Sequence, residues 1–417
     1  MARASTGKSR GASSRIGWPL KIIVGVLLVL LVLLVLNAFA LNNETKPAEI
    51  NVPGGQLVNT TSGQLQVLDT GEPPAQASLP VVLIHGSAGA INWWDDLIPL
   101  LEPDHRVIAI DMLGYGGSEK PDSDYSIETQ GRAIAEVLSR LGVSRAVLVG
   151  HSLGGKVVTS VAEQAPALAA GLTVIDTAPD NSFGGLSGGA RASRTPLLGQ
   201  ALWRVAPDSM VRKNLEQGFA PGYDVPDKFV EDVREMTYPA YKDSAVQGEE
   251  YTEDQTLVER LTALEKPLLV IFGEEDQIYD AREALSAYAA IPGVETRLIV
   301  QSGHSPQVEA PEQTANMINT FAASIVAADT ARIARARALV RKQQAKKRQA
   351  RNRVRQQEAK RRNPRNKASQ QAGNQQQKQQ PQQQGPAQNP GNSGQSSANG
   401  ASADAKTESG KDWQATP

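Results

Sequence analysis

A serine and a histidine occur in this chain in an order that could support nucleophilic acyl chemistry. Ser152 is the centre of the pentapeptide Gly150-His151-Ser152-Leu153-Gly154, which has the pattern G-x-S-x-G. A serine hydroxyl is a weak nucleophile, so it needs a base, and the base needs an acidic group that fixes its tautomer. The chain has four histidines, and only His304 follows Ser152 in the sequence. We therefore predict that Ser152 is the nucleophile and that His304 is its base.

The acid is expected between these two residues, because the order serine, acid, histidine accompanies this pentapeptide pattern. The apolar run 267–272 ends in the acidic segment Gly273-Glu274-Glu275-Asp276, and Asp280 lies just beyond it. Asp176, which follows the apolar run 172–175, is a second candidate. The residues alone leave the choice among these carboxylates open.

Acyl chemistry develops negative charge on a carbonyl oxygen, and preorganised N–H donors stabilise that charge. We expect one donor to be the backbone N–H of Leu153, at the start of the helix that follows Ser152. The other is expected in the segment His85-Gly86-Ser87-Ala88-Gly89, where the backbone N–H of Ser87 is our candidate. The alternative interpretation of this segment is an ordinary Gly-rich turn between a strand and a helix.

The segments on both sides of Ser152 are those that a nucleophile elbow requires. The run 145–149 is short, apolar and β-branched, which is typical of a buried strand, and 156–164 places valines at helical spacing. A serine in such a turn has a strained backbone, so small residues are needed two positions away on either side. Gly150 and Gly154 meet this need, and the turn then holds the Ser152 hydroxyl at the carboxyl edge of the sheet.

Around this centre, apolar strand-like runs alternate with helical patterns, which predicts a mostly parallel α/β sheet with helices on both faces. A hairpin over 56–69 precedes this alternation, and a stretch without clear strands, about 180–264, is expected to be an inserted helical cap. The expected strands are 56–60, 64–68, 80–84, 106–110, 145–149, 172–175, 267–272 and 296–300, and the expected helices include 93–101, 127–141 and 311 to about 327.

Several of these segments together resemble the α/β-hydrolase superfamily, from about Gln56 to Val326. They are His85-Gly86, the loop Asp111-Met112-Leu113-Gly114-Tyr115-Gly116-Gly117-Ser118, the Ser152 pentapeptide, the segment 273–276 and Gly303-His304. Gln277-Ile278 also resembles the acid loop of that superfamily. The resemblance implies a doubly wound sheet with a helical cap, and a catalytic triad of Ser152, Asp276 and His304. It implies no cofactor, and we expect no metal.

The loop 111–118 resembles the branch that contains epoxide hydrolases, haloalkane dehalogenases and carbon–carbon bond hydrolases. The nucleophile of the first two is an aspartate, so Ser152 argues against both activities. Ester hydrolysis of the carboxylesterase type remains, together with thioester, lactone, amide or carbon–carbon hydrolysis and cofactor-free perhydrolysis. A binding protein on a hydrolase fold is the competing hypothesis. Trp94 and Tyr115 are candidates for the substrate pocket, with packing between helix and sheet as the alternative.

Charge is segregated along the 417 residues, although the formal net charge is only −1. Residues 1–21 carry five Lys or Arg and no acid, whereas 332–367 carry 16 Lys or Arg against Glu358 alone. The chain has no cysteine, which excludes disulfides, thiol catalysis and a Cys-based zinc site. An acidic hydrolase domain, expected over 55–330, therefore lies between two basic ends.

A stretch of 20 residues from Ile22 to Leu41 has Asn37 as its one clearly polar side chain. At about 1.5 Å per residue such a helix spans a bilayer core of roughly 30 Å. A cleaved signal peptide is the alternative, because Ala38-Phe39-Ala40 resembles a cleavage site. We favour a single-pass anchor with 1–21 in the cytoplasm, since positive charge flanks the cytoplasmic side of a span. The segment 42–54 is then a tether to an extracytoplasmic hydrolase domain.

The C-terminal part divides by composition into a basic segment, 331–368, which could be helical, and a low-complexity tail. The tail, 369–417, is rich in Gln, Asn, Pro, Gly and Ser and is expected to be disordered. An anionic polymer or lipid surface could bind the basic segment, and a solvated charge run is the alternative. We do not expect nucleic acid to be the partner.

The charge asymmetry across 22–41 predicts that protease added to intact cells or spheroplasts digests the hydrolase domain. Detection of the domain by an antibody before and after treatment measures this, with a cytoplasmic protein as the protection control. Full protection of the domain would contradict its extracytoplasmic placement, and a mature N-terminus near Leu41 would indicate signal-peptide cleavage instead.

Overall fold

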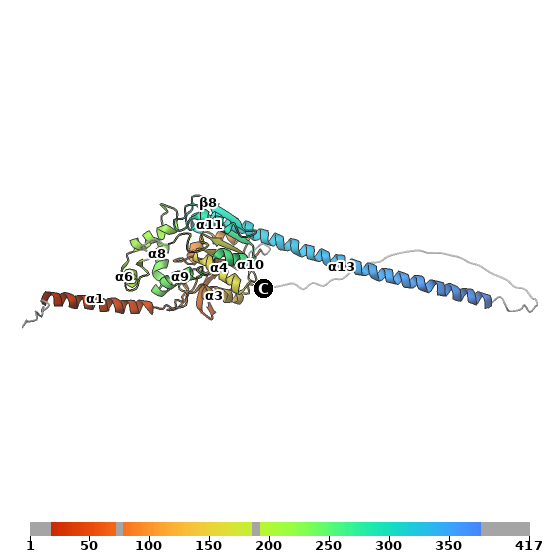
Figure 1. Cartoon of the computed structure of the whole chain (residues 1–417), viewed down its shortest axis with the longest axis horizontal. Helices are drawn as coiled ribbons and strands as arrows, with labels where there is room; N and C mark the ends of the chain where they lie inside the picture. Colours follow the sequence, from red (N-terminus) through yellow and green to blue (C-terminus); the bar gives the residue numbers. More distant parts are fainter. Residues whose placement is uncertain (1–17, 72–77, 186–191, 377–417) are drawn as a thin grey trace, which may run out of the picture. The chain divides into compact units, whose positions relative to one another are not determined.

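A computed structural model describes residues 18–71, 78–185 and 192–376 (Figure 1). The chain divides into a unit up to Ala336 and a second unit from Arg337 onward, and each is described by itself. Most of the predicted cytoplasmic segment 1–21 and of the predicted tail 369–417 lies outside the described residues. The hydrolase domain and the apolar N-terminal helix both belong to the first unit.

An eight-stranded sheet forms the centre of the first unit, with the strand order β1-β2-β4-β3-β5-β6-β7-β8. The hairpin β1–β2 and the pair β2–β4 are antiparallel, and the remaining neighbours are parallel. The predicted fold class, a mostly parallel α/β-hydrolase sheet, is confirmed. The strands are β1 (Gly55–Thr60), β2 (Gly63–Asp69), β3 (Val81–Ile84), β4 (Val107–Ile110), β5 (Ala146–His151), β6 (Ala169–Ile175), β7 (Leu268–Gly273) and β8 (Glu295–Ile299).

The strand order reverses at β3, because β4 lies on one side of it and β5 on the other. Crevices at the carboxyl ends of parallel strands form at such a reversal, and ligands bind there. Ile84, the last residue of β3, pairs with Gly150 of β5. The loop after β3 and the turn that contains Ser152 therefore begin side by side.

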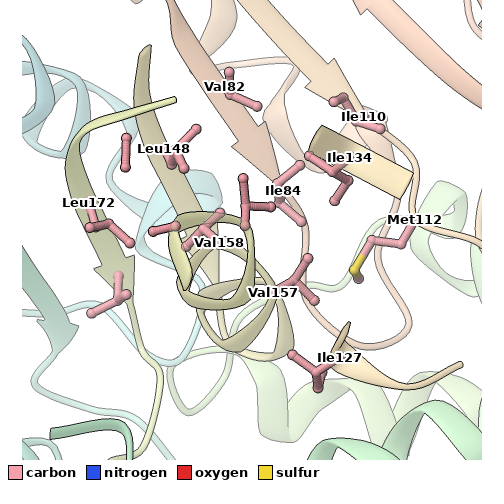
Figure 2. Packing of buried hydrophobic residues seen from close by; sticks show 14 of the residues in the cluster. Val82, Ile84, Ile110, Met112, Ile127, Ile134, Leu148, Val157, Val158 and Leu172 are labelled. Atoms are coloured by element: carbon pink, nitrogen blue, oxygen red, sulfur yellow. The ribbon is translucent and has the colours of Figure 1, made fainter. Parts of the chain in front are cut away.

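Side chains alternate between the two faces of the sheet, as the two-residue period of a strand requires. On one face Val82, Ile84 and Leu148 pack with α3 (Ile127–Arg140) and α4 (Leu153–Gln164), and Figure 2 shows this packing. The opposite face packs with η1 (Ile91–Trp94), α2 (Ile98–Leu101) and the first turns of α13. Each such fully buried aliphatic side chain stabilises the fold by about 1.5–3 kcal/mol relative to exposure.

One expected helix, 93–101, forms instead as the two short pieces η1 and α2. Pro99 lies in the first turn of α2, and a proline without an N–H suits a helix start rather than a helix interior. The helix after Ser152 begins at Leu153, three residues before the valine pattern indicated. The remaining body helices are α10 (Leu257–Leu264), α11 (Ala281–Tyr288) and α12 (Pro306–Glu309).

Between β6 and α10 the described chain forms a helical cap. Asp232 on α8 fastens this cap to η1, because its carboxylate accepts Asn92 Nδ2 at 2.9 Å and Trp93 Nε1 at 3.0 Å. Burial raises the pKa of Asp232 to about 7, and these two hydrogen bonds oppose the shift. A buried cluster of Trp93, Phe219, Val225 and Phe229 lies beside this junction. The cap elements are α6 (Leu198–Val205), α7 (Asp208–Leu215), η2 (Glu216–Gly218), α8 (Asp227–Glu235) and α9 (Tyr238–Glu250).

The N-terminal helix α1 (Trp18–Asn42) has 25 residues and is long and apolar enough to cross a membrane, which fits a membrane span or a signal sequence. The segment after α1, expected to be a tether, is fastened to the hydrolase body. Lys46 and Lys120 exchange backbone hydrogen bonds of 2.9 Å, and the Glu49 N–H donates to Gly117 O at 2.9 Å. Residues 44–52 therefore form a strap across the body rather than a free linker.

The C-terminal helix α13 (Pro311–Gln376) has 66 residues, so the expected helix to about 327 and the basic segment 331–368 form one continuous helix. Its first turns are buried against the sheet through Ala315, Ile318, Phe321, Ala322 and Ile325. In the second unit, every described side chain from Arg337 to Arg362 is exposed.

Candidate active site

Ser152 sits in a strained turn between β5 and α4. Its backbone has φ 50° and ψ −115°, a left-handed region that residues other than glycine rarely adopt. The surrounding backbone holds it there, because Ser152 N donates to Ile175 O at 2.8 Å. A Cβ on Gly150 would lie 2.2 Å from Gly154 O, and a Cβ on Gly154 would lie 2.3 Å from Ile84 O. Both positions therefore require glycine for the close approach of α4 to the sheet.

His304 and Asp276 meet at the carboxyl edge because they follow the parallel neighbours β8 and β7. His304 Nδ1 lies 2.8 Å from Asp276 Oδ2. The other carboxylate oxygen accepts the backbone N–H groups of Ile278 at 2.7 Å and Tyr279 at 3.2 Å. Asp276 is thereby fixed in one orientation, and it fixes the imidazole ring in turn.

The surroundings of Asp276 favour its charged form. Burial alone would raise the pKa of this carboxyl, but the charge of His304 and the hydrogen bonds from His304, Ile278 and Tyr279 outweigh burial. The pKa of Asp276 therefore lies below its usual value. A carboxylate that is ionised at neutral pH can accept the Nδ1–H of a histidine and stabilise the imidazolium form.

Asp176, the alternative acid, lies next to this pair, and one side-chain atom each of Asp176, Asp276 and His304 lies within 4.8 Å of the others. Burial raises the pKa of Asp176 well above its usual value, and the charge of Asp276 raises it further. The surroundings of Asp176 therefore favour its neutral form. Asp176 Oδ1 accepts Gly273 N at 3.0 Å, whereas Oδ2 has no hydrogen-bond partner among the described residues.

These three side chains also have the atom types of a metal site, but their arrangement suits a hydrogen-bonded relay better. A histidine nitrogen that donates a proton to a carboxylate has no lone pair for a metal ion. Because His304 Nδ1 is directed at Asp276, we read this cluster as two carboxyl groups that support one imidazole.

Ser152 and His304 line one cavity of about 740 Å³ together with Ser87 and Leu153. Within the described residues no hydrogen bond joins the Ser152 hydroxyl to the His304 ring; such bonds often tighten only when substrate is bound. The main-chain oxygen of His304 accepts His151 Nε2 at 2.7 Å. The elbow itself is thus tied to the histidine loop.

The two expected N–H donors border the same cavity. Leu153 is the first residue of α4, where a backbone N–H has no acceptor within the helix. Ser87 precedes Ala88, whose φ of 62° marks a tight turn in the loop after β3. The cavity therefore brings together Ser87, Leu153, Ser152 and His304, which sequence reasoning had placed on three separate segments.

The structure places Trp94 and Tyr115 away from the cavity, contrary to the expectation that they line it. Both are fully buried. Trp94 lies in the core on the α13 side of the sheet. The Tyr115 ring lies edge-on to the His85 ring, with 5.0 Å between the ring centroids. Trp93 lines the cavity instead. Successive residues in the tight 3₁₀ turn η1 point in different directions, so one of the two tryptophans faces the cavity and the other faces the core.

Sequence reasoning missed Lys156, which lies one helical turn after Ser152 and also lines the cavity. Its Nζ donates to Gly248 O at 2.8 Å and to Thr252 Oγ1 at 3.1 Å, and burial lowers its pKa to about 8. The spacing of four residues on one helix was the available signal. Leu41 at the end of α1 and the strap residues Glu44 and Lys46 also line the cavity, and no local pattern marked them.

Residues 81–317 match the Alpha/beta hydrolase family. Over 265 residues the chain is 28% identical to the 2-hydroxymuconate semialdehyde hydrolase of Pseudomonas sp. strain CF600, covering 60% of this chain and 89% of that protein. Among solved structures, it is similar to an N-acyl homoserine lactonase complexed with N-hexanoyl homoserine lactone, with a TM-score of 0.56, 20% identity, and coverage of 66% of this chain and 98% of that one.

A thermophilic esterase from Thermogutta terrifontis is also similar, with a TM-score of 0.53 and 23% identity, covering 65% of this chain and 99% of that one. At these identities the two solved structures show a shared fold and nothing about the substrate. The family match includes the cap, whereas the basic part of α13 lies beyond it.

The two neighbouring carboxyl groups are expected to respond differently to conversion into amides. Asp276→Asn removes the charge that supports His304 and should lower turnover by roughly 10⁴-fold, as the analogous change does in serine proteases. Asp176→Asn replaces a carboxyl group whose surroundings favour its neutral form by a neutral amide, and should stay within about tenfold of the original turnover. Steady-state hydrolysis of an ester measures both, and thermal unfolding controls for folding. If Asp176→Asn lost most of its turnover while Asp276→Asn kept nearly normal turnover, the acid would be Asp176.

Proposed function

The chain belongs to the alpha/beta hydrolase family, and we propose that it is a membrane-anchored serine hydrolase that cleaves ester-type carbonyl substrates. The observation that carries this proposal is the 2.8 Å contact between His304 Nδ1 and Asp276 Oδ2 in the cavity that Ser152 lines. A strained serine, a histidine and an ionised acid at one sheet edge are the components of a catalytic triad.

In this proposal His304 Nε2 takes the proton of Ser152 as the serine oxygen bonds to the carbonyl carbon. The carbonyl oxygen becomes negatively charged, and the backbone N–H groups of Ser87 and Leu153 stabilise it. The protonated His304 then donates its proton to the leaving group, and an acyl-enzyme remains. Water, deprotonated by His304, attacks the acyl carbon and regenerates the free serine. Asp276 stabilises the imidazolium at both stages.

The volume and the lining of the cavity suit a small-molecule acyl or carbonyl substrate. A volume of about 740 Å³ falls in the range of small-molecule sites, roughly 300–1,000 Å³. Its walls combine the apolar side chains of Trp93, Leu202 and Trp203 with a few charged groups. Esterase and lactonase structures share this fold, and these activities are consistent with the same triad.

Carbon–carbon bond hydrolysis is the alternative chemistry, and the similarity to a 2-hydroxymuconate semialdehyde hydrolase supports it. Cofactor-free perhydrolysis would use the same residues. A surface-anchored binding protein is the alternative of another class, but it leaves the strain at Ser152 without a purpose. We infer no cofactor for any of these activities.

We further propose that α1 anchors the protein in a membrane and that the basic part of α13 binds an anionic polymer or lipid surface. Sixteen Lys or Arg over 332–367 against Glu358 alone support electrostatic attraction that salt would screen. The side chains from Arg337 to Arg362 are exposed, so their charge is available to an anionic partner.

If Ser152 is the nucleophile, Ser152→Ala should abolish labelling by a fluorophosphonate probe and lower turnover by several orders of magnitude. His304→Ala should do nearly as much, and the two losses should not add, because triad members act as a unit. Ser87→Ala is the matched control, since it lines the same cavity and keeps its backbone N–H. Full hydrolysis by Ser152→Ala would refute the serine hydrolase proposal.

Truncation of the chain after Ala336 should remove salt-sensitive adsorption to anionic lipid or cell-wall polymer and leave ester hydrolysis unchanged. Co-sedimentation at low and high salt measures adsorption, and a truncation after Gln376 is the control that keeps the basic helix. Equal adsorption of both truncated chains would mean that the charge run is only solvated.

A further inference from the structure

The last turns of α1 pack against the cap. Side chains from Leu20 to Leu36 are exposed, whereas Ala38 and Leu41 are 7% and 4% exposed. The neighbours of α1 at this end are α6 and α9 (Figure 1). Gln200 of α6, which is 4% exposed, donates through Nε2 to Asn42 Oδ1 at 3.0 Å.

This burial lies in the last turn of the predicted membrane span. At about 1.5 Å per residue, a helix crosses a hydrocarbon core of roughly 30 Å in about 20 residues. Twenty residues counted from Ile22, the first residue after Lys21, end at Leu41, so the buried Ala38 and Leu41 belong to the last turn of the span. The Lys46 side chain also donates to Glu235 O of α8 at 2.9 Å. The cap is therefore held at the membrane surface, at the point where α1 leaves the bilayer.

The outer side of the cap at this point exposes large apolar side chains beside the exposed Arg204 and Asp208. Leu198 and Val205 of α6 are 53% and 72% exposed, and Met210 of α7 is 46% exposed. Leu198 and Val205 are seven residues apart, so they lie on one face of the helix. Exposed apolar side chains that cluster beside a membrane span are consistent with contact with lipid.

The inner side of the same helix lines the cavity. Leu202 and Trp203 of α6 border it together with Ser152, and so do Met210 of α7 and Leu41 at the end of α1. The cavity thus extends from the candidate nucleophile to the end of α1. One short helix separates its interior from the apolar outer face.

We propose that the outer face of α6 and the start of α7 dock into the membrane surface, and that the cavity receives the acyl chain of a membrane-dissolved ester directly from the bilayer. This inference rests on the proposed function, both on the hydrolase and on the membrane span. An acyl chain that passes between apolar surroundings avoids exposing its methylene groups to water. The substrate class is therefore a lipid-like ester rather than a freely soluble one.

The absence of cysteine from the chain makes a depth measurement direct. Val205→Cys in the otherwise unchanged full chain takes a single environment-sensitive fluorophore, and the protein is reconstituted in vesicles of phosphatidylcholine and phosphatidylglycerol. We expect blue-shifted emission and quenching by lipids with a nitroxide near the headgroup. Val326→Cys on α13, with a side chain 38% exposed, is the matched control and should remain unquenched. Water-like, unquenched emission at position 205 would overturn the docking face.

A second measurement tests the route of the substrate. The double variant Leu198→Glu and Val205→Glu places charge on the outer face and leaves every residue of the cavity wall in place. Its kcat/KM should fall by roughly tenfold or more for a long-chain ester dissolved in the vesicles, and stay unchanged for a short, water-soluble ester. Val326→Glu should change neither rate. An unchanged rate on the vesicle ester would overturn direct entry from the bilayer.

These outcomes separate the two levels of inference. If the wild-type chain hydrolyses both esters but position 205 stays in water, the docking face is wrong and the hydrolase stands. If position 205 is quenched but neither ester is hydrolysed, the membrane contact stands, whereas the hydrolase and the acyl-chain route fall together.

Discussion

The close approach of the first turn of α4 to the end of β3 is the constraint on which the candidate site depends. A side chain on Gly154 would lie 2.3 Å from Ile84 O, so a glycine is required where helix and strand meet. This contact lets the chain turn sharply at Ser152, whose backbone strain is offset by the hydrogen bond of its N–H to Ile175 O. It also brings the first N–H groups of α4 next to the loop after β3, where Ser87 lies. Loss of this approach would separate the candidate nucleophile from both expected N–H donors at once.

The second constraint is electrostatic, because two carboxyl groups and one imidazole share a buried space. Two adjacent carboxylates cannot both be ionised at low energy, so the proton goes to the group with fewer stabilising contacts. Among the described residues, Asp276 accepts from His304 and from two backbone N–H groups, whereas Asp176 accepts from Gly273. Burial and the charge of Asp276 raise the pKa of Asp176, whereas the contacts of Asp276 lower its own pKa, so the two neighbours are shifted in opposite directions.

The segment after α1 lies against both the cap and the α/β body. Lys46 Nζ donates to Glu235 O of the cap, and the Glu49 N–H donates to Gly117 O of the body, while Asn42 at the end of α1 accepts from Gln200 of the cap. The same strap forms part of the cavity wall. A change of α1 relative to the cap would therefore alter the cavity itself, and in our proposal this couples the membrane anchor to substrate access.

The sequence by itself determined the fold class, since strand and helix periods, turn glycines and the pentapeptide around Ser152 are local signals. It also made Ser152 and His304 the candidates for nucleophile and base, because only one histidine follows the serine. Tertiary structure alone decided what depends on contacts between distant segments. Trp93 rather than Trp94 faces the cavity, and residues 44–52 form a strap rather than a tether. Composition could not separate these cases, because neighbouring tryptophans have the same chemistry, and a polar segment becomes fixed only when a distant strand offers hydrogen-bond partners.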